Sequence, residues 1–305
     1  MTRHFKTLYD LSPKELTALL DRAAELKRLR GTADAPRPLE GKSVVILLEK
    51  ASTRTRVSFE VGVFELGGQP ITLLAKDTQL GRGEPLSDTA RMFSGYAHGV
   101  VYRTFGHDRI EGLAEHARIP IVNGLSEDYH PCQLLADLQT VRAHTGGVLE
   151  GVSAAWIGDG NNMAHSWIVA AAQTGLDLRL ACPEGYDPKP DIVETARAKG
   201  ATITLTRDPH EAVRGARVVT TDVWASMGQE EEQAAREAAF AGFEVDSALM
   251  DGAADDALFL HCLPAHRGEE VAADVIDGPR SVVWEEAENR LHAQKALLEL
   301  LVSMS

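Results

Sequence analysis

Hydroxyl and guanidinium side chains gather directly after the apolar run at 42–49. Ser52, Thr53, Arg54 and Thr55 stand where a buried strand would give way to a helix. A serine caps such a helix, and the unpaired N–H groups of its first turn then face outward at the positive end of the helix dipole. The hydroxyl groups and the guanidinium fork add donors that suit phosphate oxygens. These four residues predict a binding site for a phosphate-like dianion.

Arg56 follows in the same stretch but is expected to do something else. On a helix, Arg54 and Arg56 point about 200° apart, so they cannot both face one ligand. We therefore expect Arg54 at the ligand and Arg56 in a structural ion pair. The alternative for the whole stretch is a well-capped helix whose arginines are solvated.

Two further places offer donors to a carbonyl or carbamoyl group. His130 precedes Pro131, which suits the first turn of a helix, and Gln133 lies within that turn. The alternative there is a histidine that caps its own helix. Arg103 ends an apolar strand, an unusual place for a charged side chain. Its alternative is an ordinary strand-end arginine.

The stretch "IGDGNN" at 157–162 ends a strand and opens a helix. It resembles the start of a dinucleotide-binding fingerprint, but Met163 stands where that fingerprint requires its third glycine. Asn162 is better interpreted as an amide that binds a substrate carboxylate.

Asp222 follows an apolar strand and is suited to an α-ammonium group. Ser226 and Met227 come next, on a glycine-containing segment that could close over a ligand. The alternative for residues 222–228 is a surface turn before an acidic helix.

Strand-like apolar runs alternate with helical patterns along the whole chain. This alternation predicts parallel sheets covered by helices on both faces, here as two doubly wound α/β domains of similar size joined by interdomain helices. We expect residues 1–146 to form the first domain, with the helix at 287–305 packing back on it, and residues 147–286 to form the second. Ser12 is expected to cap the first long helix, and residues 280–286 to form the last strand.

Composition excludes several classes of protein. The 305 residues carry a net charge of −14, which repels nucleic acid and anionic membranes. We see no signal peptide and no run of about 20 apolar residues, so we expect a cytoplasmic protein outside the membrane. Cys132, Cys182 and Cys262 are too few and too scattered for a disulfide framework or a zinc site. We expect neither a metal nor a cofactor.

The motifs together resemble the ornithine carbamoyltransferases of the aspartate/ornithine transcarbamylase family. "STRTR" at 52–56, Arg103, "HPCQ" at 130–133, "DVWASMGQE" at 222–230 and "HCLP" at 261–264 occur in the order typical of these enzymes. The first and third mark the carbamoyl-phosphate half of transcarbamylases generally, whereas "SMG" and "HCLP" mark the ornithine branch. The resemblance covers the chain from its first helix to its last.

The resemblance implies transfer of the carbamoyl group of carbamoyl phosphate to the δ-amine of L-ornithine, in a homotrimer with active sites at the subunit interfaces. Cys262 and Leu263 would contact both substrates without a covalent intermediate, and Arg290 would point at the carbamoyl group. A loop residue, here Gln79, would reach the phosphate of a neighbouring subunit.

The expected catalytic residues are Arg103, His130, Cys262 and Arg290. The expected carbamoyl-phosphate site is Ser52, Thr53, Arg54, Thr55, Gln79, Arg103, His130, Gln133, Cys262, Leu263 and Arg290, and the expected ornithine site is Asn162, Asp222, Ser226, Met227, Cys262 and Leu263.

Other functions stay open from the sequence. An NAD-dependent dehydrogenase would suit two Rossmann-like halves, although the missing glycine argues against it. A non-catalytic paralogue could bind carbamoyl phosphate without turnover, and putrescine or acetylated ornithine could replace ornithine as the acceptor. The sequence leaves open whether the enzyme serves arginine synthesis or breakdown.

Overall fold

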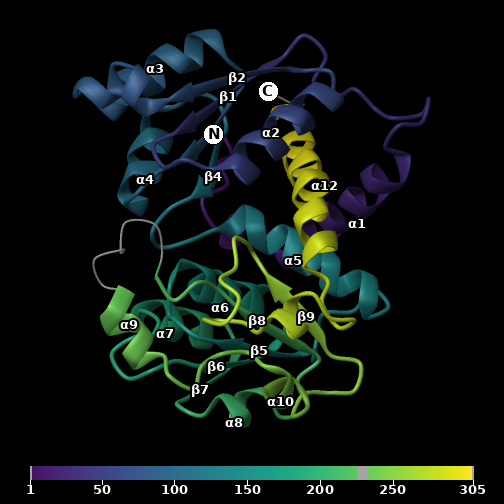
Figure 1. The fold of residues 1–305 in the computed structure, drawn as a ribbon. Helices are drawn as coiled ribbons and strands as arrows, with labels where there is room; N and C mark the ends of the chain where they lie inside the picture. The colour runs from purple at the N-terminus through teal and green to yellow at the C-terminus, as the bar shows by residue number, and fades with distance from the viewer. Residues whose placement is uncertain (1, 226–232, 304–305) are drawn as a thin grey trace. The chain divides into compact units, whose positions relative to one another are not determined.

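The structure, a computed structural model, describes residues 2–225 and 233–303 (Figure 1). Its tertiary contacts group the chain into two compact units. The first unit runs to Gln139 and resumes at Glu288, and the second unit is Thr140–Ala287. No helix within the described ranges is both long and apolar enough to cross a membrane.

The first unit is built on a four-stranded parallel sheet with the strand order β2-β1-β3-β4. The strands are β1 (Ser43–Leu48), β2 (Gln69–Leu74), β3 (Gly99–Arg103) and β4 (Ile121–Leu125). The helices that fall in this unit, some of them shared with the second, are α1 (Pro13–Leu29), α2 (Thr53–Glu65), α3 (Leu86–Tyr96), α4 (His107–His116), α5 (Pro131–His144) and α12 (Val283–Val302), with short 3₁₀ turns at Leu8–Asp10, Ala75–Asp77 and Leu80–Arg82.

The second unit is built on a five-stranded parallel sheet with the strand order β7-β6-β5-β8-β9. The strands are β5 (Ser153–Ile157), β6 (Asp177–Ala181), β7 (Thr202–Thr206), β8 (Val218–Thr221) and β9 (Leu258–His261). Its helices are α6 (Asn162–Thr174), α7 (Pro190–Ala198), α8 (Pro209–Val213), α9 (Gln233–Ala239), α10 (Ser247–Met250) and α11 (Ala273–Ile276).

The central strands of both sheets are largely buried because both of their faces are covered. Five successive residues of β1 are buried, from Val44 to Leu48, and so is all of β8. In each sheet the chain reverses its direction of travel once, between β1 and β3 and between β5 and β8. In doubly wound sheets such reversals leave a crevice at the carboxyl ends of the strands where ligands bind. Each unit thus has one such position.

The structure confirms the predicted fold class of parallel α/β sheets. Ser12 caps α1 as expected, since its hydroxyl accepts from the Glu15 N–H and the Glu15 carboxylate accepts from the Ser12 N–H. The strand predicted at 280–286 is wrong. Only Ser281 bridges to β9, and α12 begins at Val283. Glu285 and Glu286 lie in the first turn of that helix, where the dipole favours acidic side chains.

Candidate active site

The predicted anion site begins where β1 leads into α2. Ser52 has extended backbone angles, and its hydroxyl accepts a hydrogen bond from the Thr55 N–H at 3.2 Å, which makes it the N-cap of α2. Thr55 is buried, whereas Arg56 is exposed and pairs with Glu60 at 3.0 Å. The expected structural ion pair of Arg56 is therefore confirmed. The first turn of α2 presents N–H groups and the dipole's positive end, as an anion requires.

Arg103 is held beside this helix start by the sheet. It ends β3 in register with Leu48 of the adjacent β1, and its carbonyl accepts from the Glu49 N–H at 2.9 Å. The Glu49 carboxylate in turn pairs with Arg109 of α4 at 2.6 Å and accepts a hydrogen bond from Thr104. The carboxyl ends of β1 and β3 are thus tied together, which fixes the backbone that carries the buried Arg103.

His130 lies buried just before α5, among guanidinium groups. Its pKa is held well below the usual range, chiefly by burial and then by the positive charges of Arg290, Arg103 and Arg54. These three arginines come from α12, β3 and α2. His130 is consequently neutral near pH 7.

Arg290 reaches this cluster from α12 in defined hydrogen bonds. Its guanidinium donates to the Gln133 side-chain oxygen at 2.6 Å and to the Thr55 hydroxyl at 3.4 Å. The Gln133 amide donates onward to Asp137 at 2.8 Å. The Gln294 amide finds partners for both of its polar atoms in one orientation. In that orientation the amide oxygen accepts from the Arg290 guanidinium at 3.0 and 3.1 Å, and the amide nitrogen donates to the Ser58 hydroxyl. Sequence reasoning missed Gln294, because a glutamine inside a helix carries no local signal.

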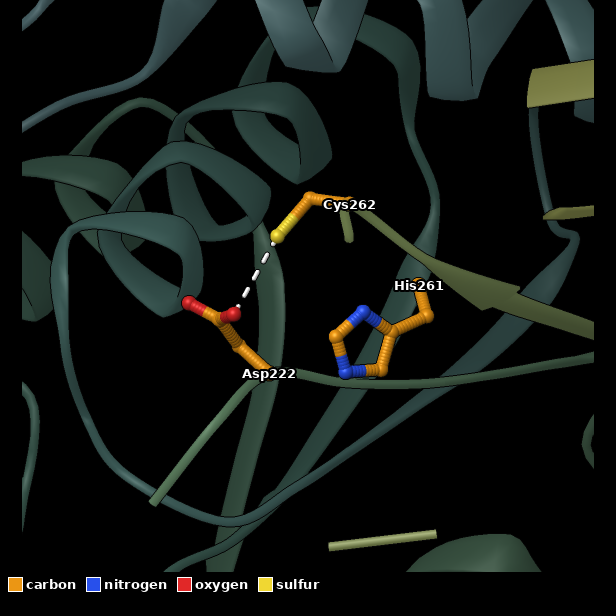
Figure 2. A group of neighbouring side chains, drawn as sticks. All are labelled: Asp222, His261 and Cys262. Atoms are coloured by element: carbon orange, nitrogen blue, oxygen red, sulfur yellow. Dashed lines mark hydrogen bonds between the residues drawn. The ribbon is translucent and has the colours of Figure 1, made fainter. Parts of the chain in front are cut away.

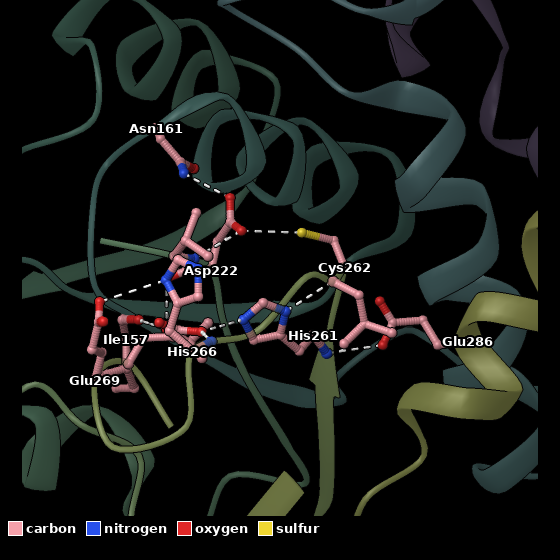
Figure 3. A network of polar contacts seen from close by, with 12 residues as sticks. Ile157, Asn161, Asp222, His261, Cys262, His266, Glu269 and Glu286 are labelled. Carbon is pink, nitrogen blue, oxygen red and sulfur yellow. Dashed lines mark hydrogen bonds and ion pairs between the residues drawn. The ribbon is translucent and has the colours of Figure 1, made fainter. Parts of the chain in front are cut away.

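The second unit carries an acidic group at its own sheet reversal. Asp222 follows β8, and Asn161 follows β5 as the N-cap of α6. The Asp222 carboxylate accepts from the Asn161 amide at 2.9 Å, from the Val223 N–H at 2.9 Å and from the Cys262 thiol at 3.2 Å (Figures 2 and 3). Asn161, which the sequence analysis did not single out, is therefore an amide in contact with Asp222.

Cys262 and Leu263 follow β9 in a turn that His261 supports. The His261 ring accepts from the Leu263 N–H at 2.9 Å, and its other nitrogen lies 3.1 Å from the fully buried Glu270. Leu263 has φ of 59°, a left-handed conformation that a leucine rarely adopts, so it needs such support. The structure thereby brings Cys262 together with Asp222, as the sequence led us to expect of the ornithine site.

Asp222, His261 and Cys262 also place ligand-type atoms within 4.8 Å of one another, as do His266, Glu269 and Glu270. A bound metal would need a free lone pair on His261. Both ring nitrogens of His261 are already engaged, so the first group is complete as a hydrogen-bonded network.

Four further predicted residues are Gln79, Asn162, Ser226 and Met227. Gln79 is exposed, and its carbonyl accepts from Arg82 and Glu84 at the start of a 3₁₀ turn. Asn162 begins α6, and its carbonyl accepts from the Ser166 hydroxyl at 2.6 Å. Ser226 and Met227 lie outside the described residues.

Comparison with known proteins gives one consistent result. The family model "Aspartate/ornithine carbamoyltransferase, carbamoyl-P binding domain" matches residues 3–143, and "Aspartate/ornithine carbamoyltransferase, Asp/Orn binding domain" matches residues 150–301. The chain is 56% identical over 300 residues to the anabolic ornithine carbamoyltransferase of Pseudomonas aeruginosa, covering 98% of this chain and 97% of that one.

Solved structures agree with the sequence matches. Ornithine carbamoyltransferase from Pyrococcus furiosus matches with a TM-score of 0.93 and 46% identity, covering 98% of this chain and 97% of that one. The anabolic enzyme from Campylobacter jejuni matches with a TM-score of 0.93 and 40% identity over all of both chains. The chain belongs to the aspartate/ornithine carbamoyltransferase family and is a carbamoyltransferase.

Proposed function

We propose that this chain transfers the carbamoyl group of carbamoyl phosphate to the δ-amine of L-ornithine, giving L-citrulline and phosphate. The observation that carries the proposal is the cluster around His130. Three arginines from separate elements act on one buried, neutral imidazole beside the capped start of α2. Such a concentration of positive charge and aligned donors is suited to a small, doubly charged phosphate compound.

In the reaction, the neutral amine attacks the carbamoyl carbon. A C–N bond forms, the C–O bond to phosphate breaks, and the proton lost by the amine ends on the departing phosphate. Ser52, Thr53 and Arg54 hold the phosphate and stabilise it as it leaves. The remaining donors act on the carbamoyl group, where negative charge develops on the oxygen. They are Thr55, Arg103, His130 and Arg290, with Gln133 orienting the carbamoyl NH₂.

A neutral His130 suits this role. Because burial and the arginines lower its pKa, the ring donates an N–H to the carbamoyl oxygen without adding a further positive charge. Its protonation state does not change across the neutral range. Positioning the amine against the carbamoyl carbon supplies much of the rate, since a deprotonated amine is already nucleophilic.

The second unit supplies the complementary charge for ornithine. Asp222 binds the α-ammonium group, Asn162 the carboxylate, and Ser226, Met227, Cys262 and Leu263 complete the site. We assign carbamoyl phosphate to a domain of residues 1–146 with the helix 287–305, and ornithine to residues 147–286. The opposite charges of the two clusters support this division.

We further propose a cytoplasmic homotrimer in which Gln79 completes the phosphate site of a neighbouring subunit. Exposed apolar side chains on α2 and β2, namely Val57, Phe64 and Ile71, support association, since it would cover them. The exposed position of Gln79 fits a reach outward from its own chain.

The direct test is citrulline formation from carbamoyl phosphate and ornithine, with putrescine, aspartate and acetylated ornithine as competing acceptors. We expect turnover with ornithine far above that with the other three. Turnover only with putrescine or acetylated ornithine would move the proposal to another amine. No turnover with any acceptor, together with retained binding of carbamoyl phosphate, would favour the non-catalytic paralogue.

A further inference from the structure

We propose that Asn161 is a positioning residue that sets the selectivity of the acceptor site for an α-amino acid. Its amide joins the Asp222 carboxylate to the start of α6. This inference rests on the proposed function, because it assumes that Asp222 receives the α-ammonium group of ornithine. Asn161 itself is not expected to touch the reacting atoms.

The orientation of the Asn161 amide is fixed by the backbone. Its oxygen accepts from the Met163 N–H at 2.9 Å and from the Ala164 N–H at 3.2 Å. The nitrogen must then point the other way, where it donates to Asp222 at 2.9 Å (Figure 3). A flipped amide would set its oxygen against a carboxylate and its nitrogen against two N–H groups. One side chain therefore both caps a helix and fixes a carboxylate oxygen.

All three partners of Asp222 in the described chain are neutral. They are the Asn161 amide, the Val223 N–H and the Cys262 thiol. Asp222 is buried, so these donors immobilise its carboxylate without compensating its charge. A buried carboxylate held in this way is pre-organised to bind a cation, and rigidity in the supporting residue determines how well it does so.

The hydrogen bond between Asn161 and Asp222 also fixes the position of Asp222 relative to the donors at the start of α6. Asn162, the first residue of that helix, carries the amide that we assign to the substrate carboxylate. An α-amino acid bears its ammonium and carboxylate groups on one carbon, so it requires a carboxylate and a set of donors at a fixed separation. Asn161 holds both. A diamine such as putrescine has no carboxylate and gains nothing from that arrangement.

Two substitutions separate capping from positioning. Asn161→Ser keeps a hydroxyl that can cap α6 but removes the donor to Asp222. We expect its KM for ornithine to rise about ten- to a hundredfold, the range for a lost hydrogen bond to a charged group. Its KM for carbamoyl phosphate should stay within about twofold of wild type. The ratio of ornithine to putrescine turnover should fall.

Asn161→Asp also keeps the cap but sets a second carboxylate against Asp222. Two carboxylates at hydrogen-bond distance cannot both stay ionised without cost. We expect the defect in kcat/KM for ornithine, taken relative to wild type at the same pH, to be severe at pH 8.5 and to lessen toward pH 6. A residue that only caps a helix would give no such pH dependence, since aspartate is itself a good N-cap.

The matched control is Asp246→Ala, which removes the N-cap of α10 in the same unit, where the Asp246 carboxylate accepts from the Leu249 N–H. It should lower the melting midpoint slightly and leave the KM for ornithine unchanged.

A wild-type protein that forms no citrulline would refute the proposed function. If the wild type is active, a normal KM for ornithine in Asn161→Ser would overturn the inference, whether or not the melting midpoint of that variant is lower. Unfolding of both Asn161 variants would assign the residue to folding alone and overturn it too.

Discussion

The two units use the same architecture to bind groups of opposite charge. Each has a parallel sheet with one reversal, β1 against β3 in the first unit and β5 against β8 in the second. The first places Arg54 and Arg103 at that point, and the second places Asp222 and Asn161 there. The scaffold therefore fixes where a ligand binds, and the few residues just past the strand ends decide its charge.

Buried histidines show the same contrast. In the first unit the charges that act on His130 come from Arg290, Arg103 and Arg54. In the second unit His261 lies 3.1 Å from the Glu270 carboxylate, with both groups inaccessible to solvent. We propose that an anionic ligand binds in the first environment, whereas in the second a carboxylate of the protein lies beside the histidine. We therefore expect substitutions around His130 to affect binding, and substitutions around His261 to affect the local fold of the Leu263 turn.

The largest effect should come from removing one charge from the first unit's site. Arg54→Ala is expected to lose about 2–5 kcal/mol of transition-state stabilisation, or about 30- to 4,000-fold in kcat/KM for carbamoyl phosphate. Arg56→Ala is the matched control, because Arg56 lies on the same helix but is exposed and paired with Glu60. It should retain nearly full activity. Equal losses in the two variants would mean that general positive potential, not the position of Arg54, holds the phosphate.

A smaller and more selective effect is expected in the second unit. Asp222→Asn keeps the size of the side chain but removes the charge that we propose binds the α-ammonium group. The KM for ornithine should rise about ten- to a hundredfold, as for a lost charged hydrogen bond, while the KM for carbamoyl phosphate changes little. Steady-state kinetics with each substrate varied in turn makes the comparison. Equal changes in both constants would contradict the division of charge between the two units.

Subunit mixing tests whether the first unit's site is complete within one chain. Arg54→Ala and Gln79→Ala homotrimers should each be clearly impaired. When equal amounts are unfolded and refolded together, an intact site can form only if Gln79 acts on a neighbouring chain. Random assembly would then restore roughly a quarter of the sites. If Gln79 acts within its own chain, activity will not exceed the mean of the two parent proteins.

Periodicity and strand-end residues were enough to predict the fold class and the elements that carry both clusters. Ser12 at α1 and the Arg56–Glu60 ion pair were predictable because capping and helical spacing are local. The strand predicted at 280–286 failed because its apolar residues suit either structure, and only Ser281 finds a partner strand.

Residues that act through long-range contacts could not be predicted in this way. Asn161 was not singled out in the sequence, because its contact with Asp222 depends on the pairing of β5 with β8, which brings the two strand ends together. Gln294 approaches Arg290 and Ser58 through the packing of α12 on α2. The pKa of His130 depends on three arginines that are far apart in sequence. Such relations follow from tertiary structure, which a linear pattern does not encode.

The smallest expected effect separates the site histidine of the first unit from a structural one. His292 of α12 is fully buried, with its Nε2 3.5 Å from Glu288, and Lys27 of α1 and Lys295 add positive charge nearby. Burial is the main cause that lowers the pKa of His292 to about 4. Because the unfolded chain binds this proton more readily, with a pKa of about 6.5, the contribution of His292 to stability is complete above pH 6.5 and is lost as the pH falls toward 4.

His292→Phe and His292→Gln remove this titration while leaving the arginines around His130 in place. The free energy of unfolding, measured with urea between pH 7.5 and pH 4.5, should fall less steeply in both variants than in wild type. The neutral-pH KM for carbamoyl phosphate should be unchanged, because His292 is no part of the proposed site. An unaltered pH slope would show that His292 is already protonated without cost in the folded protein. A raised KM would instead mean that the charge of the first unit's site depends on packing along the whole of α12, and not only on the residues that face the ligand.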